Sequence, residues 1–158
     1  MQLQIRQRVF SWTDHYDIFD EMGNPRYEVW TEFFALGHQI HVRDKRTGRE
    51  VGAIHEKILA LLPRFEIVVN GQCLGSVRKE FTFFRPRYQV DYQCWRVEGN
   101  FGGWDYRVLQ GSRTVMTISK GIFTWTDTYC LRFDDPADEI PGLLLVLAID
   151  AANCDRNE

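Results

Sequence analysis

Residues 142–152 read GLLLVLAIDAA and form the centre of the one strongly apolar run in the chain. The whole run, residues 140–152, is 13 residues long and contains Pro141 and Asp150. A helix that crosses a bilayer needs about 20 apolar residues, so this run is too short to be a transmembrane segment. Because a helix that is apolar on nearly every face must be buried on all sides, the run predicts a helix at the centre of the fold.

The residues before the run predict where this helix begins. The segment DDP at residues 134–136 is expected to end the preceding strand, and Asp138 is a candidate N-cap. Pro141 is tolerated in a first turn, where its missing N–H costs nothing. The side chains expected to form the buried core helix are Leu143, Leu144, Leu145, Val146, Leu147 and Ile149.

One sequence pattern recurs in six units along the rest of the chain. A typical unit has a bulky apolar pair, a short turn-like stretch, and then an anchor residue followed two places on by another apolar residue. Successive anchors are 24, 25, 23, 18 and 23 residues apart, and they are Tyr16, Ile40, Phe65, Tyr88, Tyr106 and Tyr129. An internal repeat of this length indicates an architecture built from one supersecondary unit.

The repeated unit has the features of paired β-strands. The segments YDI (16–18) and FEI (65–67) alternate apolar and polar residues, which is the period of a half-buried strand. Asn70-Gly71 separates two such stretches, and a two-residue Asn-Gly link is the strongest short hairpin signal. We therefore expect a mostly β fold, a closed antiparallel barrel of about twelve strands around one central apolar C-terminal helix.

Length and composition bound the class of protein. A chain of 158 residues with 44% apolar and 26% charged residues is typical of one globular domain, so we expect residues 1–158 to form a single domain. A net charge of −3 gives no reason to expect nucleic acid as a partner. Four cysteines outside any C-x-x-C pair and an opening MQLQIRQRV without a signal-peptide core favour reduced thiols and a cytoplasmic location.

Several long segments resemble the LURP-one-related proteins. They are RQRVFSWTDHYDIFDEMGNPRYEV (6–29), FEIVVNGQCLGSVRKEFTFFRPRYQV (65–90), SKGIFTWTDTYCLRF (119–133) and IPGLLLVLAIDAA (140–152). That family belongs to a group with a Tubby C-terminal-like fold, which includes the phospholipid scramblases. The resemblance, which covers nearly the whole chain, implies a twelve-stranded closed barrel around a C-terminal helix. Tubby domains bind phosphoinositide headgroups, but the chain matches neither a Tubby-specific motif nor the calcium-binding segment and palmitoylated cysteine cluster expected of scramblases.

Two groups of basic residues could meet anionic groups through charge-assisted hydrogen bonds. One surrounds a turn at residues 43–49, and the other flanks the segment FTFF at residues 81–84. The second is the better candidate, because its basic residues lie beside aromatic side chains that look exposed. The alternative for both groups is a set of solvated strand ends whose charge is diluted by neighbouring acids. The residues predicted to contact an anion or a lipid are Arg78, Lys79, Arg85 and Arg87.

Other candidate sites have simpler structural explanations, and we predict no catalytic residue, metal or cofactor. His38 and His41 lie three apart and would point to opposite faces of a strand, so a shared metal is not expected. The acidic segment 134–139 could hold a cation, but carboxylates there also favour the positive end of the following helix. Trp12 and Trp125 occupy matching places in the first and last units and are expected to close the barrel.

These patterns favour a non-enzymatic binding or interaction module. No G-x-S-x-G, H-E-x-x-H, Walker or G-x-G-x-x-G motif is present. Since a helix would fill the interior, binding is expected on loops or on the outer surface, with a protein as one class of partner. The alternative is peripheral recognition of anionic phospholipid or phosphoinositide headgroups near Arg85 and Arg87. An enzyme with an unfamiliar surface site is a further alternative.

A charged side chain in the middle of the apolar helix tests whether the helix is enclosed. Replacement of Leu145 or Leu147 by aspartate should unfold the protein, because an unpaired carboxylate would have to enter the core. Thermal melting followed by circular dichroism measures the effect. A variant that retained the parent melting temperature would show that the helix lies outside the barrel.

Overall fold

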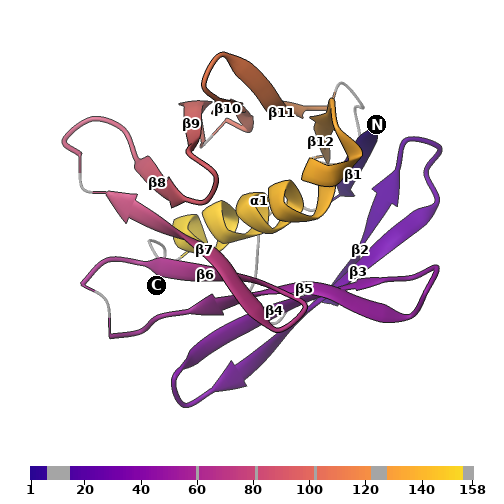
Figure 1. Ribbon diagram of the computed structural model, residues 1–158, viewed down its shortest axis with the longest axis horizontal. Coiled ribbons are helices and arrows are strands. Elements are labelled where there is room, and N and C mark those ends of the chain that lie inside the picture. The colour runs from indigo at the N-terminus through magenta and orange to yellow at the C-terminus, as the bar shows by residue number, and fades with distance from the viewer. Residues whose placement is uncertain (7–14, 60, 81, 102, 122–127, 155–158) are drawn as a thin grey trace.

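The computed structural model describes residues 1–6, 15–59, 61–80, 82–101, 103–121 and 128–154. Most of these residues belong to strands or to one long helix (Figure 1). The first six strands are β1 (Gln2–Arg6), β2 (His15–Asp20), β3 (Pro25–Phe34), β4 (Gly37–Asp44), β5 (Arg49–Glu56) and β6 (Arg64–Val69). The next six are β7 (Gln72–Glu80), β8 (Arg87–Asp91), β9 (Trp95–Asn100), β10 (Asp105–Gln110), β11 (Arg113–Lys120) and β12 (Thr128–Phe133). A 3-10 helix, η1 (Pro136–Asp138), leads directly into α1 (Glu139–Cys154).

All twelve of these strands form one antiparallel sheet that curves around α1 (Figure 1). The order is β8-β7-β6-β5-β4-β3-β2-β1-β12-β11-β10-β9, so β1 and β12 pair in the middle. Within the described part of the chain, β8 and β9 form no ladder with each other. The twelve-stranded antiparallel architecture around a C-terminal helix is therefore confirmed, and the barrel is nearly closed.

The hairpin predicted at Asn70-Gly71 joins β6 to β7. Both residues have positive φ, 51° and 75°, as a two-residue type I′ turn requires. The ladder is shifted by one residue between Ile67 and Val68, so beyond this bulge Phe65 lies opposite Val77. Both of these side chains are fully buried, so the bulge places inward-facing residues of β6 opposite inward-facing residues of β7.

The helix α1 lies in the centre of the curved sheet, as its composition predicts (Figure 1). The backbone of β5 approaches it so closely that a Cβ on Gly52 would lie 2.6 Å from Cδ1 of Leu144. A helix packed this tightly on every side contributes much of the apolar burial that stabilises the fold. The six predicted core side chains are each 0% exposed, namely Leu143, Leu144, Leu145, Val146, Leu147 and Ile149.

Asp138, the predicted N-cap residue, directly precedes α1 and is the last residue of the 3-10 helix η1. Asp135 caps η1, and its Oδ1 accepts a hydrogen bond from the backbone N–H of Ala137 at 2.9 Å. The carboxylate of Asp138 accepts from Nη1 of Arg113 at 2.9 Å. Pro136 lies in the first turn of η1, where its missing N–H costs nothing.

Side chains from the sheet satisfy the other end of α1. The Lys79 ammonium is buried, and its Nζ donates to the carbonyl of Ala152 at 2.9 Å. The Tyr88 hydroxyl also hydrogen-bonds the side chain of Asn153. The last turn of the helix contains no basic residue, so the ammonium on β7 supplies the positive charge that favours a helix C-terminus.

One carboxyl group is enclosed in the apolar core. The Tyr129 hydroxyl donates to Oδ2 of Asp150 at 2.7 Å, while Oδ1 of Asp150 and the Tyr106 hydroxyl have no hydrogen-bond partner among the described residues. Burial raises the pKa of Asp150 well above its usual value, and the Tyr129 hydrogen bond only partly opposes this rise. The folded state therefore retains the Asp150 proton at pH values where the unfolded chain has lost it.

Asp150 should make the protein less stable as the pH rises. Because its pKa is raised on folding, its contribution to stability is complete below the unfolded pKa of about 3.9 and declines above it until the folded pKa is passed. The variant Asp150→Asn has no carboxyl group at this position and therefore lacks this decline. The free energy of unfolding of the variant, relative to that of the parent, should increase with pH above about 4 by at most about 1.4 kcal/mol per pH unit. Urea denaturation between about pH 4 and pH 8 measures the difference.

A control for this measurement is Thr117→Ser, which changes an exposed side chain on β11 and removes no titratable group. Its stability curve should run parallel to that of the parent. If the Asp150→Asn curve were also parallel, the carboxyl group would not be titrating differently in the folded and unfolded states.

Candidate functional site

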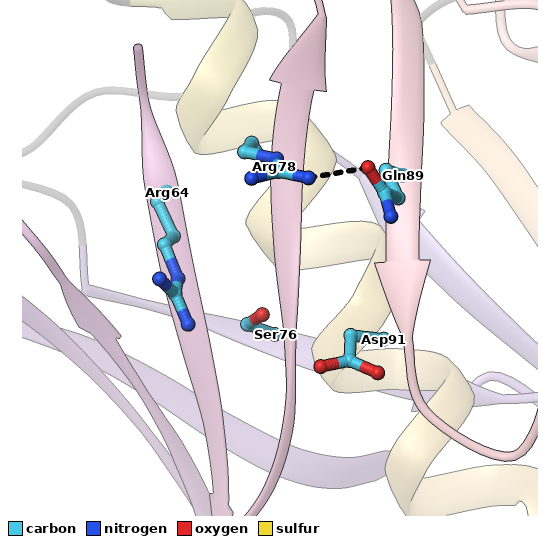
Figure 2. A pocket seen from close by; sticks show the side chains of 5 residues that line it. All are labelled: Arg64, Ser76, Arg78, Gln89 and Asp91. Carbon is cyan, nitrogen blue, oxygen red and sulfur yellow. Dashed lines mark hydrogen bonds between the residues drawn. The ribbon is translucent and has the colours of Figure 1, made fainter. Parts of the chain in front are cut away.

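A polar pocket of about 210 Å³ lies on β6, β7 and β8. Figure 2 shows its side chains on the three neighbouring strands, with α1 on the other side of the sheet. Its position means that a ligand would bind to the outside of the barrel. The residues that line it are Arg64, Ser76, Arg78, Gln89 and Asp91.

Strand alternation places these side chains on the outer face. Phe65, Val77 and Tyr88 are buried against the core, so the residues next to them in sequence point outward. The register then aligns the outward residues across the three strands. Arg64 is opposite Arg78, and Arg78 is opposite Gln89. In the next outward row, Ser76 is opposite Asp91.

The close approach of β7 and β8 depends on Gly75. A Cβ at this position would lie 2.0 Å from the backbone oxygen of Asp91 and 3.0 Å from Cβ of Tyr92. Any side chain larger than hydrogen would therefore push β8 away from β7. The glycine thus holds Asp91, and with it one wall of the pocket, in place.

The two guanidinium groups are the most distinctive feature of the pocket. Arg78 donates from Nη2 to Oε1 of Gln89, a neutral partner, as Figure 2 shows. No salt bridge within the described part of the chain involves Arg64 or Arg78. The arginines can therefore donate to an anionic group, while the Asp91 carboxylate can accept from a hydroxyl or ammonium group on the same ligand.

The predicted anion-binding residues divide between the two faces of the sheet. Arg78 lines the pocket, and Arg87 points outward two residues before Gln89, on the same face of β8. Arg85 is exposed in the loop before β8, where its N–H donates to Oγ1 of Thr82 at 3.3 Å. Lys79 lies on the inner face and binds the end of α1, so it is separate from the outer arginines.

Two members of the other basic group are paired with acids. Arg43 Nη1 lies 3.0 Å from the Glu28 carboxylate, and Lys45 Nζ lies 2.9 Å from that of Asp17. Exposed ion pairs of this kind contribute little to stability, but they reduce the positive charge that an anion would meet. The structure therefore favours the group around Arg78 as the anion-binding surface.

The remaining candidates are accounted for by local contacts. His38 pairs with Glu56, whereas the ring of His41 stacks on that of Trp30 with centroids 5.1 Å apart. Among the described residues, no three His, Cys, Asp or Glu side chains are arranged to hold a metal ion. In the same residues, no helix is long and apolar enough to cross a membrane. The matching tryptophans, Trp12 and Trp125, lie outside the described residues.

The nearly closed barrel around a C-terminal helix has the Tubby-like fold. The family model described as LURP-one-related matches residues 1–150. The chain therefore belongs to the LURP-one-related family, as the resemblance of its sequence indicates.

A curated relative and a solved structure are similar over nearly the whole chain. "Uncharacterized protein YxjI" of Bacillus subtilis (strain 168) is 27% identical over 150 residues, which cover 95% of this chain and 92% of that protein. The X-ray structure of a protein from Arabidopsis thaliana has a TM-score of 0.62 at 16% identity and covers 95% of this chain and 91% of that one. At this identity the second likeness establishes the fold alone.

Substitution of Gly75 tests how the pocket is assembled. Gly75→Ala should destabilise the protein by about 2 kcal/mol, because the added methyl group collides with the backbone of β8. Amide hydrogen exchange should also lose protection across residues 87–91. The control Gln72→Ala, at an exposed position on the same strand, should change stability by less than about 0.5 kcal/mol. Equal stabilities for the two variants would contradict this account of the β7–β8 contact.

Proposed function

We propose that this chain is a single-domain, non-enzymatic binding module that recognises a phosphate-bearing ligand at the outer pocket. The observation that carries the proposal is the pair Arg64 and Arg78, which lie opposite each other without an acidic partner in the described part of the structure. Arginine donates through a planar fork that matches the oxygens of phosphate, so two adjacent arginines form a suitable receptor.

The arginine pair is unfavourable for the sheet itself. Like charges directly opposite each other on neighbouring strands destabilise the pairing. On other strands of the sheet, some exposed basic residues have acidic partners, as Arg43 has Glu28 and Arg107 has Glu98. A bound anion would relieve the repulsion between Arg64 and Arg78. The arrangement is therefore better explained by binding than by stability.

The architecture supports an external site. Leu143–Ile149 side chains fill the centre of the barrel, which directs a ligand to the outer face. Cys73, Cys94 and Cys130 are free thiols, consistent with a cytoplasmic setting. The proposed ligand carries a phosphate that the arginines bind and a hydroxyl group that Asp91 accepts from. A phosphorylated polyol has both groups.

Charge-neutral substitutions in the pocket test the proposal. Inositol 1,4,5-trisphosphate should bind to the parent protein, and either Arg64→Gln or Arg78→Gln should weaken its affinity about tenfold or more, since hydrogen bonds to charged groups contribute about 1.5–3 kcal/mol each. Isothermal titration calorimetry measures the dissociation constant. Affinity should also fall as the salt concentration rises.

The control is Arg49→Gln, which removes the same charge from the other basic group. Its affinity should stay within about twofold of the parent value, since Arg49 lies beyond the turn at the far end of β5. Equal losses of affinity in all three variants would mean that the ligand responds to the net charge of the protein and not to the pocket. Absence of binding to the parent protein would refute the proposed phosphate ligand.

A further inference from the structure

Three loops on one end of the barrel, which follow β3, β5 and β7, expose large apolar side chains. Leu59 and Leu61, in the loop between β5 and β6, are 95% and 97% exposed. Phe83 and Phe84, in the loop between β7 and β8, are 100% and 97% exposed. In the hairpin between β3 and β4, more than half of the surface of each of three further side chains is exposed, namely Phe33, Phe34 and Leu36. We refer to these three loops together as the apolar end.

The antiparallel order places all three loops together. Strands β3 to β8 follow one another in the sheet, so the link after every second strand returns to the same edge. Contacts confirm the adjacency, because a Cβ on Gly37 would lie 3.1 Å from Cγ2 of Ile58. The N–H of Lys79 also donates to the carbonyl of Pro63 at 3.1 Å. The C-terminal end of α1 points toward this same end of the molecule (Figure 1).

Positive charge lies directly behind the apolar tips. Arg85 and Arg87 follow Phe83 and Phe84 in the chain, and Arg64 begins the strand after Leu61. No salt bridge among the described residues engages any of these three arginines. Apolar side chains that project outward, backed by unpaired cations, are complementary to a surface with an apolar interior and anionic headgroups.

We propose that the apolar end docks on an anionic lipid bilayer. The tips of the three loops enter the interfacial region, and Arg85 and Arg87 contact headgroup phosphates. The inference rests on the proposed function in one respect, since the arginine pocket behind the loops then receives a phosphate from the same membrane. It identifies the source of that phosphate as a lipid.

The form of the surface favours a membrane over a protein partner. The exposed apolar side chains belong to three separate loops and project outward one by one. A fluid interface can accommodate projecting side chains one by one, and apolar burial combined with a basic patch supplies the two contributions that stable peripheral binding requires.

The opposite end supplies a matched control. There, the exposed large apolar side chains of the described residues include Met22, in the turn after β2, and Leu74, near the start of β7. The double variant Met22→Ser/Leu74→Ser removes exposed apolar surface without touching the apolar end. The test variant is Phe83→Ser/Phe84→Ser, which should fold normally because both side chains are exposed to solvent.

Co-sedimentation tests the inference with vesicles of phosphatidylcholine alone and with about 20 mol% phosphatidylserine. The parent protein should bind the anionic vesicles. Phe83→Ser/Phe84→Ser should lower its partition coefficient about tenfold or more, and the control variant should leave it unchanged. Arg85→Gln/Arg87→Gln should weaken binding to anionic vesicles and reduce its dependence on salt. Calorimetry with inositol 1,4,5-trisphosphate should give the same affinity for Phe83→Ser/Phe84→Ser as for the parent.

The outcomes separate this inference from the proposed function. If the parent binds the soluble phosphate but not anionic vesicles, the membrane inference is overturned and the pocket stands. If vesicle binding depends on Phe83 and Phe84 while the soluble phosphate does not bind, membrane docking is supported and the pocket proposal fails. If the parent is a dimer that Phe83→Ser/Phe84→Ser converts to a monomer, a second copy occupies the apolar end and the inference is overturned.

Discussion

The enclosure of α1 on every side is the constraint on which the rest of the structure depends. An apolar helix with Asp150 near its C-terminal end can be buried only if the sheet curves fully around it and also supplies polar partners. Lys79 donates to the carbonyl of Ala152, and the Tyr129 hydroxyl donates to the carboxyl group of Asp150. Because the helix occupies the interior, the chemistry available for recognition is left to the outer face and the loops.

Much of the fold was predictable from local sequence, but of the residues that line the candidate site only Arg78 was. The apolar run and the Asn70-Gly71 link act over a few residues, and both were placed correctly. Counting outward from that turn without a bulge would set Arg64 opposite Val77, on the wrong face. The register shift after Val68 instead pairs Arg64 with Arg78. No short pattern in the sequence marks this bulge, so the pairing of Arg64 with Arg78 could not be predicted.

Arg78 and Lys79 illustrate why composition alone cannot assign function. They are adjacent in the sequence and equally basic, and a count of charges treats them alike. Strand alternation sends Arg78 to the outer pocket and Lys79 into the core, where it binds the end of the helix. The same alternation adds Arg87 to the outer row. A basic cluster in a β protein therefore has to be divided by face before it is interpreted as a surface.

The pairing of β1 with β12 links folding to the order of synthesis. Gln2 lies opposite Arg132, and the helix that fills the barrel comes later still. The strands β2 to β8 can pair with their neighbours as they emerge, but their inner apolar faces have no helix to cover them until the end of the chain is available. Contacts this distant in sequence slow folding, and apolar surface that stays exposed during that interval favours aggregation. The helix α1 is thus the last element to cover the inner face of the sheet.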